Sequence, residues 1–350
     1  MTASITIAGR PVGSDHPPYM IAEMSGNHNG ELSRALEIVV AAKDAGADAV
    51  KLQTYTADTI TIDHNGPGFT VEGTLWEGRT LYDLYDEAHT PWDWHRPIFD
   101  KARELGMPVF SSPFDFTAID FLEDLGCPAY KIASFEAVDL PLIERAAATG
   151  KPVIISTGLA SRDEIADAIA AAKKAAGQDP AILHCISTYP TEPGNCNLRV
   201  IPAMIDSFGI VVGFSDHTLG TAAAVSAVAL GASIIEKHIT LDRSDGGPDA
   251  AFSLEPGEFA RMVEDCNVAF AARGHGRFER PKAEDGLAVF RRSLYVVEDV
   301  ASGGILTPRN VRSIRPGYGL APRHLNEVLG KAAASDLKRG TPLSWELIAK

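Results

Sequence analysis

The sequence predicts an α/β protein in which a (β/α)8 TIM barrel precedes a small, β-rich C-terminal domain. First, eight short apolar or β-branched runs alternate with helical segments from Tyr19 onward. Second, the runs are nearly continuous in apolar residues, which is typical of parallel strands covered on both faces. Third, the pattern changes near Gly286 to short β-like runs broken by Gly and Pro. Eight strand–helix repeats is the number that closes a barrel. A doubly wound open sheet is the alternative, but no G-x-G-x-x-G follows the first run.

Composition limits the class of protein. The chain has 350 residues, 45% of them hydrophobic and 22% charged, which excludes a wholly disordered chain. A net charge of −14 argues against a nonspecific nucleic-acid binder, although it leaves room for a local anion site. The four cysteines are far apart, so they indicate neither a zinc site nor a disulfide framework and fit the reducing cytoplasm. The N-terminus lacks the pattern of a signal peptide, and no apolar run reaches the ~18 residues of a membrane span. We therefore expect a cytoplasmic protein without a membrane partner.

The first predicted element is a small hairpin ahead of the barrel. The sequence ITIAGRPVG, near the N-terminus, indicates this hairpin, which would plug the N-terminal face of the barrel. The eight predicted strands are YMIAEM (19–24), AVKLQTY (49–55), PVFSSPF (108–114), AYKIAS (129–134), PVIISTG (152–158), AILHCIS (181–187), IVVGFSDHT (210–218) and SIIEKHIT (233–240). Helical periodicity lies between them, for example over 32–46 and 161–177. In the second example Ser161 and Glu164 have the spacing of a capping box, and Gly177 marks the end.

The connection after the second predicted strand, residues 56–90, is far longer than usual. It contains Trp76, Tyr82, Tyr85 and His89, and three of the four tryptophans fall within 76–94. Because a loop after a strand lies on the catalytic face of a barrel, this segment is interpreted as a lid over the mouth. A satellite core beneath a long loop is an equal alternative.

The two domains are predicted at residues 1–280 and 281–350, with a polar linker over 274–285. Their charges differ in sign: residues 286–350 carry ten Lys and Arg against five Asp and Glu, whereas the remainder has a net charge of −19. Opposite charges favour docking of the basic domain over a barrel mouth, its own or a partner's.

Polar side chains occur at the C-terminal ends of nearly all the predicted strands, where barrels hold their active sites. A period of two places Ser215 with His217, and Glu236 with His238, on shared faces of neighbouring strands. Imidazoles are common ligands of divalent metals, so His217 and His238 form a candidate metal pair with Glu23 as a nearby carboxylate. The alternative is that each of these groups is a hydrogen-bonded structural residue.

Two lysines, Lys51 and Lys131, are directed toward the same mouth in an otherwise acidic protein. Ser112, Ser134 and Ser156 add hydroxyl donors, and this combination suits a phosphate or carboxylate. Pairing of each lysine with a neighbouring carboxylate is the alternative. An anion cradle beside a metal suggests metal-assisted carbon–carbon or phosphate chemistry.

These residues belong to an ordered set of motifs that resembles the sialic acid synthase family from about Tyr19 to the C-terminus. The motifs are IAEMSGNHNG (21–30), KLQTYT, SSPFD, PAYKIAS, ISTG, FSDHT, EKHIT, GGPDAAFS, FRRSLYVV and RSIRPGYGL. Within that family, the segments KLQTYTADTITID, LWEGRTLYDLYDEAHTPWDWH and GGPDAAFSLEP look most like the pseudaminic acid synthase branch.

The resemblance implies a condensation of phosphoenolpyruvate with an open-chain acetamido sugar, giving a nine-carbon 2-keto acid and phosphate. It also implies a barrel joined to an antifreeze-like (SAF) domain in a domain-swapped homodimer. By motif, His217 and His238 would bind a divalent metal ion, Mn²⁺ first with Mg²⁺ or Co²⁺ as alternatives, and Glu23 and then Glu236 would transfer protons. Phosphoenolpyruvate would contact Lys51, Ser112, Lys131, Ser134, Ser156, Ser187 and Ser215. The sugar would contact Gln53, Tyr189, Asp249, Phe290 and Arg315, the last from the partner's SAF domain.

The pseudaminic branch implies 2,4-diacetamido-2,4,6-trideoxy-L-altrose as the sugar. Synthases of N-acetylneuraminate or legionaminic acid are the enzymatic alternatives. Ser112 and Ser187 stand where sialic-acid-type members commonly have Thr and Asn, and this difference bears on the sugar more than on the chemistry. A non-catalytic sugar-binding protein is the remote alternative.

Overall fold

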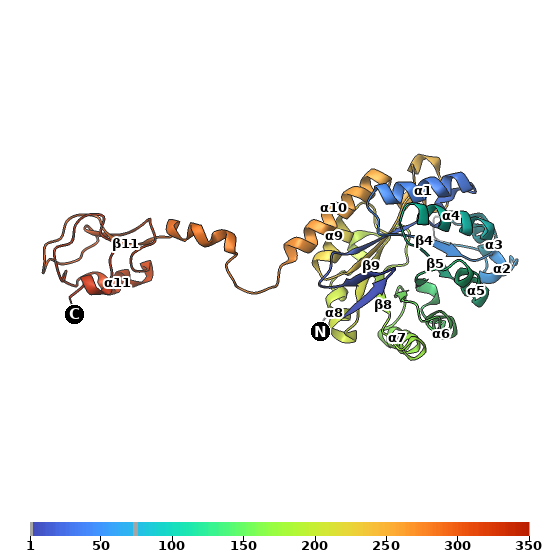
Figure 1. Ribbon diagram of the computed structural model, residues 1–350, viewed down its shortest axis with the longest axis horizontal. Helices are drawn as coiled ribbons and strands as arrows, with labels where there is room; N and C mark the ends of the chain where they lie inside the picture. The colour runs from blue at the N-terminus through green and yellow to red at the C-terminus, as the bar shows by residue number, and fades with distance from the viewer. Residues whose placement is uncertain (1–2, 73–75, 350) are drawn as a thin grey trace. The chain divides into compact units, whose positions relative to one another are not determined.

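The computed structural model describes residues 3–72 and 76–349 and divides the chain into two compact units, Met1–Gly274 and His275–Lys350 (Figure 1). The first unit contains the barrel and a core of buried apolar residues that continues through all its strands. The second unit has its own small core. Among the described residues no helix is long and apolar enough to cross a membrane.

All eight predicted runs form strands of one closed parallel barrel, which confirms the barrel and excludes the open sheet. The strands are β3 (Tyr19–Glu23), β4 (Ala49–Thr54), β5 (Val109–Pro113), β6 (Tyr130–Ile132), β7 (Val153–Ser156), β8 (Ala181–Cys185), β9 (Val212–Asp216) and β10 (Ile234–His238). Closure is made by β10 and β3, which pair from Ile234 opposite Tyr19 to His238 opposite Glu23. The carboxyl ends of all eight strands therefore meet at one mouth.

Helices surround the barrel on the outside (Figure 1). They are α1 (Leu32–Asp44), α4 (Trp92–Glu104), α5 (Phe116–Asp124), α6 (Leu140–Ala147), α7 (Arg162–Ala176), α8 (Val200–Phe208), α9 (Ala222–Ala229) and α10 (Pro256–Arg273). Helix α7 begins at the capping box of Ser161 and Glu164 and ends at Gly177, whose φ of 71° needs the left-handed region. Local sequence signals thus fix the limits of this helix as predicted.

The N-terminal hairpin consists of β1 (Ser4–Ile7) and β2 (Arg10–Gly13). Its Ile7 and Val12 are fully buried in the barrel core. The Arg10 guanidinium donates hydrogen bonds to the carbonyls of Pro17 and Pro18, which directly precede β3. The hairpin therefore packs at the N-terminal end of the barrel, and the catalytic end stays open.

The long connection between β4 and α4 contains two short helices, α2 (Ala57–Ile60) and α3 (Leu81–Ala88). Its tryptophans have different surroundings. Trp92 opens α4 and stacks on Phe121 at 4.7 Å between ring centroids, and Trp94 packs against the barrel core. Trp76 instead donates its indole N–H to the carbonyl of Pro248, which follows β10, and borders the barrel mouth.

The second unit contains an antiparallel pair, β11 (Ser293–Val296) and β12 (Val311–Ile314), joined by further isolated bridges. This unit also contains the short helix α11 (Leu325–Val328). Leu329 is extended and Gly330 has a φ of 87°, so the chain leaves the helix there.

Candidate active site

A cavity of about 620 Å³ opens at the carboxyl ends of the barrel strands. Twelve of the predicted site residues line it: Lys51, Gln53, Lys131, Ser134, Ser156, Ser187, Tyr189, Ser215, His217, Glu236, His238 and Asp249. Their position follows from the topology, because each one lies in a parallel strand of the closed barrel or in the segment that follows one.

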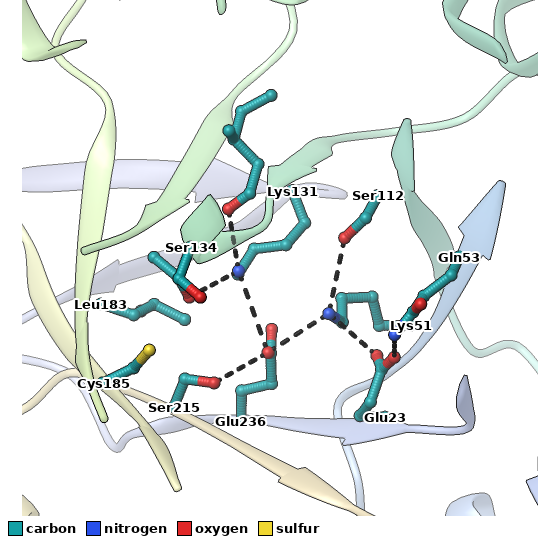
Figure 2. Close-up of polar contacts among 12 residues, drawn as sticks. Glu23, Lys51, Gln53, Ser112, Lys131, Ser134, Leu183, Cys185, Ser215 and Glu236 are labelled. Carbon is teal, nitrogen blue, oxygen red and sulfur yellow. Dashed lines mark hydrogen bonds and ion pairs between the residues drawn. The ribbon is translucent and has the colours of Figure 1, made fainter. Parts of the chain in front are cut away.

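The floor of the cavity is a buried cluster of charges around Glu236 (Figure 2). Its Oε1 atom lies 3.2 Å from Lys51 Nζ and 3.9 Å from Lys131 Nζ, and it accepts a hydrogen bond from Ser215 Oγ at 3.0 Å. One carboxylate therefore lies between two ammonium groups. With Glu23, the second carboxyl beside Lys51, in its protonated form, a net positive charge is left for an anionic ligand.

The two lysines titrate differently. Burial would lower the pKa of Lys51, but Glu23 and Glu236 outweigh it and hold the pKa above its usual value. Burial lowers the pKa of Lys131 to about 8. The charge of Glu236 acts against this decrease, and the charge of Lys51 adds to it. For Glu236, burial would raise the pKa, but Lys131 and Lys51 keep it below its usual value. Lys51 and Glu236 are thus charged at neutral pH, and Lys131 is the group nearest to losing its proton.

Glu23 lies behind this floor rather than on it. Its side chain is fully buried, with Oε2 3.0 Å from Lys51 Nζ and Oε1 accepting a hydrogen bond from Gln53 Nε2 at 2.9 Å (Figure 2). Burial raises its pKa to about 7 despite the attraction of Lys51. Ser112 is also fully buried, with Oγ 3.5 Å from Lys51 Nζ. Glu23 and Ser112 therefore contact the cavity-lining lysine without lining the cavity themselves.

The serines form a polar wall beside Lys131. Lys131 Nζ donates to Ser156 Oγ at 2.6 Å, and the hydroxyls of Ser134 and Ser187 are 2.8 Å apart. The backbone of Gly158 packs tightly against this wall: a Cβ atom at this position would lie 2.2 Å from Ser187 Oγ. Only glycine lets the backbone approach so closely. The wall can supply several hydroxyl donors to a phosphate or carboxylate.

His217 and His238 meet at the ends of β9 and β10, with ring centroids 5.6 Å apart. Burial lowers the pKa of His217 to about 4 and that of His238 well below its usual value, so both rings are neutral at pH 7. His217 Nδ1 donates to the carbonyl of Ile186 at 2.9 Å, which leaves its Nε2 as an electron-pair donor. Within the described part of the chain, His238 Nδ1 is buried without a hydrogen-bond partner. Two neutral adjacent imidazoles fit a divalent ion.

The two histidines have no third protein ligand beside them. Within residues 3–72 and 76–349, no group of three His, Cys, Asp or Glu side chains lies close enough together to bind a metal ion. Asp249 Oδ2 is 3.9 Å from His238 Nδ1. The remaining positions around an ion held by the two histidines would belong to water or substrate oxygens, the open arrangement typical of catalytic metal sites.

The predicted sugar contacts fall into two groups. Gln53, Tyr189 and Asp249 line the cavity, and the Tyr189 ring lies 4.3 Å from the His217 ring and 5.3 Å from the Phe252 ring. Phe290 and Arg315 belong to the second unit, where Phe290 is exposed.

Several cavity residues were missing from the prediction. Glu136 lines the cavity, and burial raises its pKa to about 7. It follows Ser134 by two residues after a predicted strand, so its position in the sequence could have revealed it. Within the β4–α4 connection, Trp76 and Tyr85, two of the residues named in the lid interpretation, line the cavity, and five apolar residues that were not named also do: Ile60, Val71, Leu81, Leu84 and Ala88. Apolar side chains carry no such signal, because the same residue types build cores.

Comparison with known proteins identifies the family. A profile of the NeuB family matches residues 38–278, and a profile of the SAF domain matches residues 291–349. The chain belongs to the NeuB family. This result confirms the resemblance to sialic acid synthases inferred from the motifs.

The NeuB-family relatives cover almost the whole chain. Pseudaminic acid synthase from Helicobacter pylori is 44% identical over 335 residues, which is 95% of this chain and 98% of that protein. The pseudaminic acid synthase from Campylobacter jejuni serotype O:2 is 43% identical over 94% of this chain and 96% of its own length. Among solved structures, an N-acetylneuraminic acid synthetase from Leptospira borgpetersenii in complex with citrate is 32% identical, with a TM-score of 0.74 over 82% of this chain and 95% of that chain.

Proposed function

We propose that this protein is a pseudaminic acid synthase, which condenses phosphoenolpyruvate with 2,4-diacetamido-2,4,6-trideoxy-L-altrose to give pseudaminic acid and phosphate. The observation that carries the proposal is the likeness to two pseudaminic acid synthases at 43–44% identity over nearly the whole chain. The legionaminic acid synthase from Legionella pneumophila is 35% identical over 97% of this chain, which favours the pseudaminic over the legionaminic reaction.

Phosphoenolpyruvate would bind on the floor of the cavity. Lys51 and Lys131 offer two cations, and the hydroxyls of Ser134, Ser156, Ser187 and Ser215 surround them. Ser112 would act through its contact with Lys51. Phosphate and carboxylate each take charge-assisted hydrogen bonds, which are stronger than neutral ones.

His217 and His238 would hold the divalent ion, for which we propose Mn²⁺, and its chemistry when bound is to polarise the aldehyde oxygen of the sugar. The neutral state of both rings supports this role. Gln53, Tyr189 and Asp249 would orient the sugar so that its aldehyde carbon faces C3 of phosphoenolpyruvate.

In the proposed reaction, C3 of phosphoenolpyruvate forms a bond to the aldehyde carbon, and water then adds to C2. The tetrahedral intermediate expels phosphate by cleavage of the C2–O bond. Lys51 and Lys131 would stabilise the charge of the departing phosphate. Glu23, whose pKa of about 7 lets it take or release a proton near neutrality, is our first candidate for proton transfer, acting through Lys51, which it contacts and which lines the cavity, and Glu236 is the second.

The wall made by the β4–α4 connection supports a sugar with a methyl group at C6. Ile60, Val71, Leu81 and Leu84 line this side of the cavity and have no side-chain hydrogen-bonding groups. A hydroxyl buried against them would lose its hydrogen bonds to water, a cost of about 1–3 kcal/mol. This wall therefore favours a 6-deoxy sugar over an N-acetylmannosamine derivative.

The second unit would complete the site from a partner chain. We propose a domain-swapped homodimer in which Phe290 and Arg315 of one chain reach the sugar bound by the other. The net charge of +5 on residues 286–350, against −19 on the rest, favours such docking. The four cysteines are free thiols, which supports a cytoplasmic enzyme.

The deciding experiment is to incubate the protein with phosphoenolpyruvate, Mn²⁺ and each sugar in turn, and to measure phosphate release. We expect turnover with the diacetamido altrose sugar. Turnover with N-acetylmannosamine alone would contradict the pseudaminic assignment, and no phosphate release with any of the sugars would contradict a synthase altogether. His217→Ala and His238→Ala serve as inactive controls.

A further inference from the structure

An ion pair lies directly behind the two cavity histidines, on the outward face of the barrel strands. Lys237 Nζ is 2.9 Å from Asp216 Oδ2, and both side chains are completely buried. Lys237 Nζ also donates to the carbonyl of Thr218, and Asp216 Oδ1 accepts a hydrogen bond from the Thr218 backbone N–H at 2.8 Å. The pair thus joins the end of β10 to the end of β9 and to the first turn beyond it.

The register places this pair beside both imidazoles. Lys237 is opposite Asp216 across the β9–β10 ladder, and the next residue along the chain is in each case a cavity histidine: His238 ends β10 after Lys237, and His217 directly follows the end of β9 at Asp216. Because successive side chains of a strand point to opposite faces, the ion pair and the histidines lie on opposite faces. A change in the spacing of the two strand ends would therefore change the spacing of the two imidazoles.

Stability alone does not account for such a pair. Removing two charges from water is costly, and well-packed apolar residues of similar volume often replace a buried ion pair with no loss of stability. Apolar residues, however, cannot form hydrogen bonds, which fix the orientation of their partners. Lys237 forms such bonds on both sides of His217 in the sequence, to Asp216 before it and to Thr218 after it. On its other side the His217 ring is held by the carbonyl of Ile186.

We propose that Lys237 and Asp216 are positioning residues, which hold the ends of β9 and β10 so that His217 and His238 converge on one divalent ion. The inference rests on the metal-binding role given to the two histidines under the proposed function. Neither Lys237 nor Asp216 lines the cavity, so the pair acts through the histidines and not on the reactants.

The test replaces the ion pair by apolar residues of similar size in the double variant Asp216→Leu/Lys237→Met of the full-length protein. Mn²⁺ binding is measured by electron paramagnetic resonance of the free ion, and thermal unfolding is followed in parallel. We expect Mn²⁺ affinity to fall about 10–100-fold, as for other residues that orient metal ligands, while the melting temperature stays near that of the wild type. Phosphoenolpyruvate binding to the metal-free protein should be unchanged, because Lys51 and Lys131 do not depend on the pair.

A second variant guards against a folding defect. Asp216→Asn keeps an acceptor for the Thr218 N–H but removes the charge, and we expect a smaller loss of Mn²⁺ affinity. The matched control is Arg10→Met/Asp48→Leu, which removes an ion pair at the opposite end of the barrel and should leave Mn²⁺ affinity unchanged.

The outcomes separate the two proposals. Wild-type Mn²⁺ affinity in both Asp216 variants would overturn the positioning role while leaving the metal site intact. An equal loss of Mn²⁺ and phosphoenolpyruvate binding would overturn it too, since it would indicate general damage to the barrel mouth. If the wild type binds no more Mn²⁺ than His217→Ala/His238→Ala, the metal site itself is wrong and the positioning role falls with it.

Discussion

Lys51 and Lys131 are directed into the same cavity, yet their ammonium groups have different surroundings. Lys51 contacts two carboxylates, at 3.0 Å from Glu23 and 3.2 Å from Glu236, whereas Lys131 has Glu236 at 3.9 Å and otherwise neutral acceptors. Burial lowers the pKa of Lys131 to about 8, because the attraction of Glu236 at this distance does not outweigh it. Of the two cations, Lys131 is the one whose charge depends on pH in the working range of an enzyme.

This asymmetry predicts an alkaline limit to phosphoenolpyruvate binding. Lys131 is protonated below about pH 8 and loses its charge as the pH rises above that value, so kcat/KM for phosphoenolpyruvate should fall above pH 8. Steady-state kinetics between pH 6 and 10 measure it. In Lys131→Met the residual kcat/KM should show no such alkaline limb, that is, no fall above pH 8. If the fall persists in this variant, it belongs to the titration of another group.

Glu236 sets where that limb lies. Its carboxylate attracts the proton on Lys131, and Lys51 repels it. Glu236→Gln removes the attraction and leaves the repulsion, so the alkaline limb should move to lower pH, with kcat/KM reduced at least tenfold at pH 7. The control is Ser215→Ala, which loses the hydrogen bond to Glu236 but keeps its charge, and whose limb should stay near the wild-type position.

Residue types and strand periodicity predicted which side chains reach the mouth, but not their depth. Glu23 ends β3, Lys51 lies within β4, and the two strands pair so that Glu23 is opposite Lys51. Both face inward, yet the longer Lys51 reaches the cavity and Glu23 stays behind it. Side-chain length and strand stagger decide between the two, and the stagger is not visible from the order of residues.

At the scale of elements, the β4–α4 connection forms one wall of the cavity and is tied to the opposite side of the mouth. Trp76 Nε1 donates to the Pro248 carbonyl at 3.1 Å, and its ring lies 5.9 Å from that of Tyr189. Pro248 in turn packs against Gly26, where a Cβ would lie 2.7 Å from Pro248 Cγ. The acceptor for the Trp76 indole is therefore held in place by tight packing.

Trp76→Phe tests this connection, because it keeps an aromatic ring and removes the N–H donor. Losing one hydrogen bond of about 1 kcal/mol should raise the KM for the sugar by roughly fivefold, with the KM for phosphoenolpyruvate unchanged. Trp92→Phe is the matched control, since its indole also donates to a carbonyl, that of Tyr55, but its ring packs on α5. It should lower the melting temperature and leave both KM values unchanged. Equal effects of the two variants on the sugar KM would contradict the role of Trp76.

The elements of the barrel were predictable, whereas the segment that forms a wall of its cavity was left between two interpretations, a lid and a satellite core. A strand covered on both faces is apolar throughout, so runs such as PVIIS reveal it directly. Trp76 and Trp92 are the same residue type within residues 76–94, and only tertiary contacts place the first at the mouth and the second against Phe121 of α5. Aromatic residues serve packing and recognition with the same chemistry.

At the scale of the whole molecule, a complementation experiment tests the proposed exchange of domains. Arg315→Ala should raise the KM for the sugar while the dimer persists in sedimentation. Lys51→Met should be inactive in its own barrel. If a tail serves the partner's barrel, coexpressing the two variants should restore about a quarter of wild-type activity, because half of the randomly formed dimers are mixed and each has one intact site. If the tail serves its own barrel, the mixture should show no gain over the separate variants.

The N-terminal hairpin closes the barrel at the end opposite the active site, and this closure has a kinetic consequence. Ile7 and Val12 fill that end, so we expect reactants to enter at the mouth, which the described residues of the β4–α4 connection border. The proposed anion site is on the floor, and the proposed sugar site lies between it and the opening. We therefore expect compulsory-order kinetics: the three-carbon acid arrives first, the sugar second, and a sugar that arrives early acts as a dead-end inhibitor.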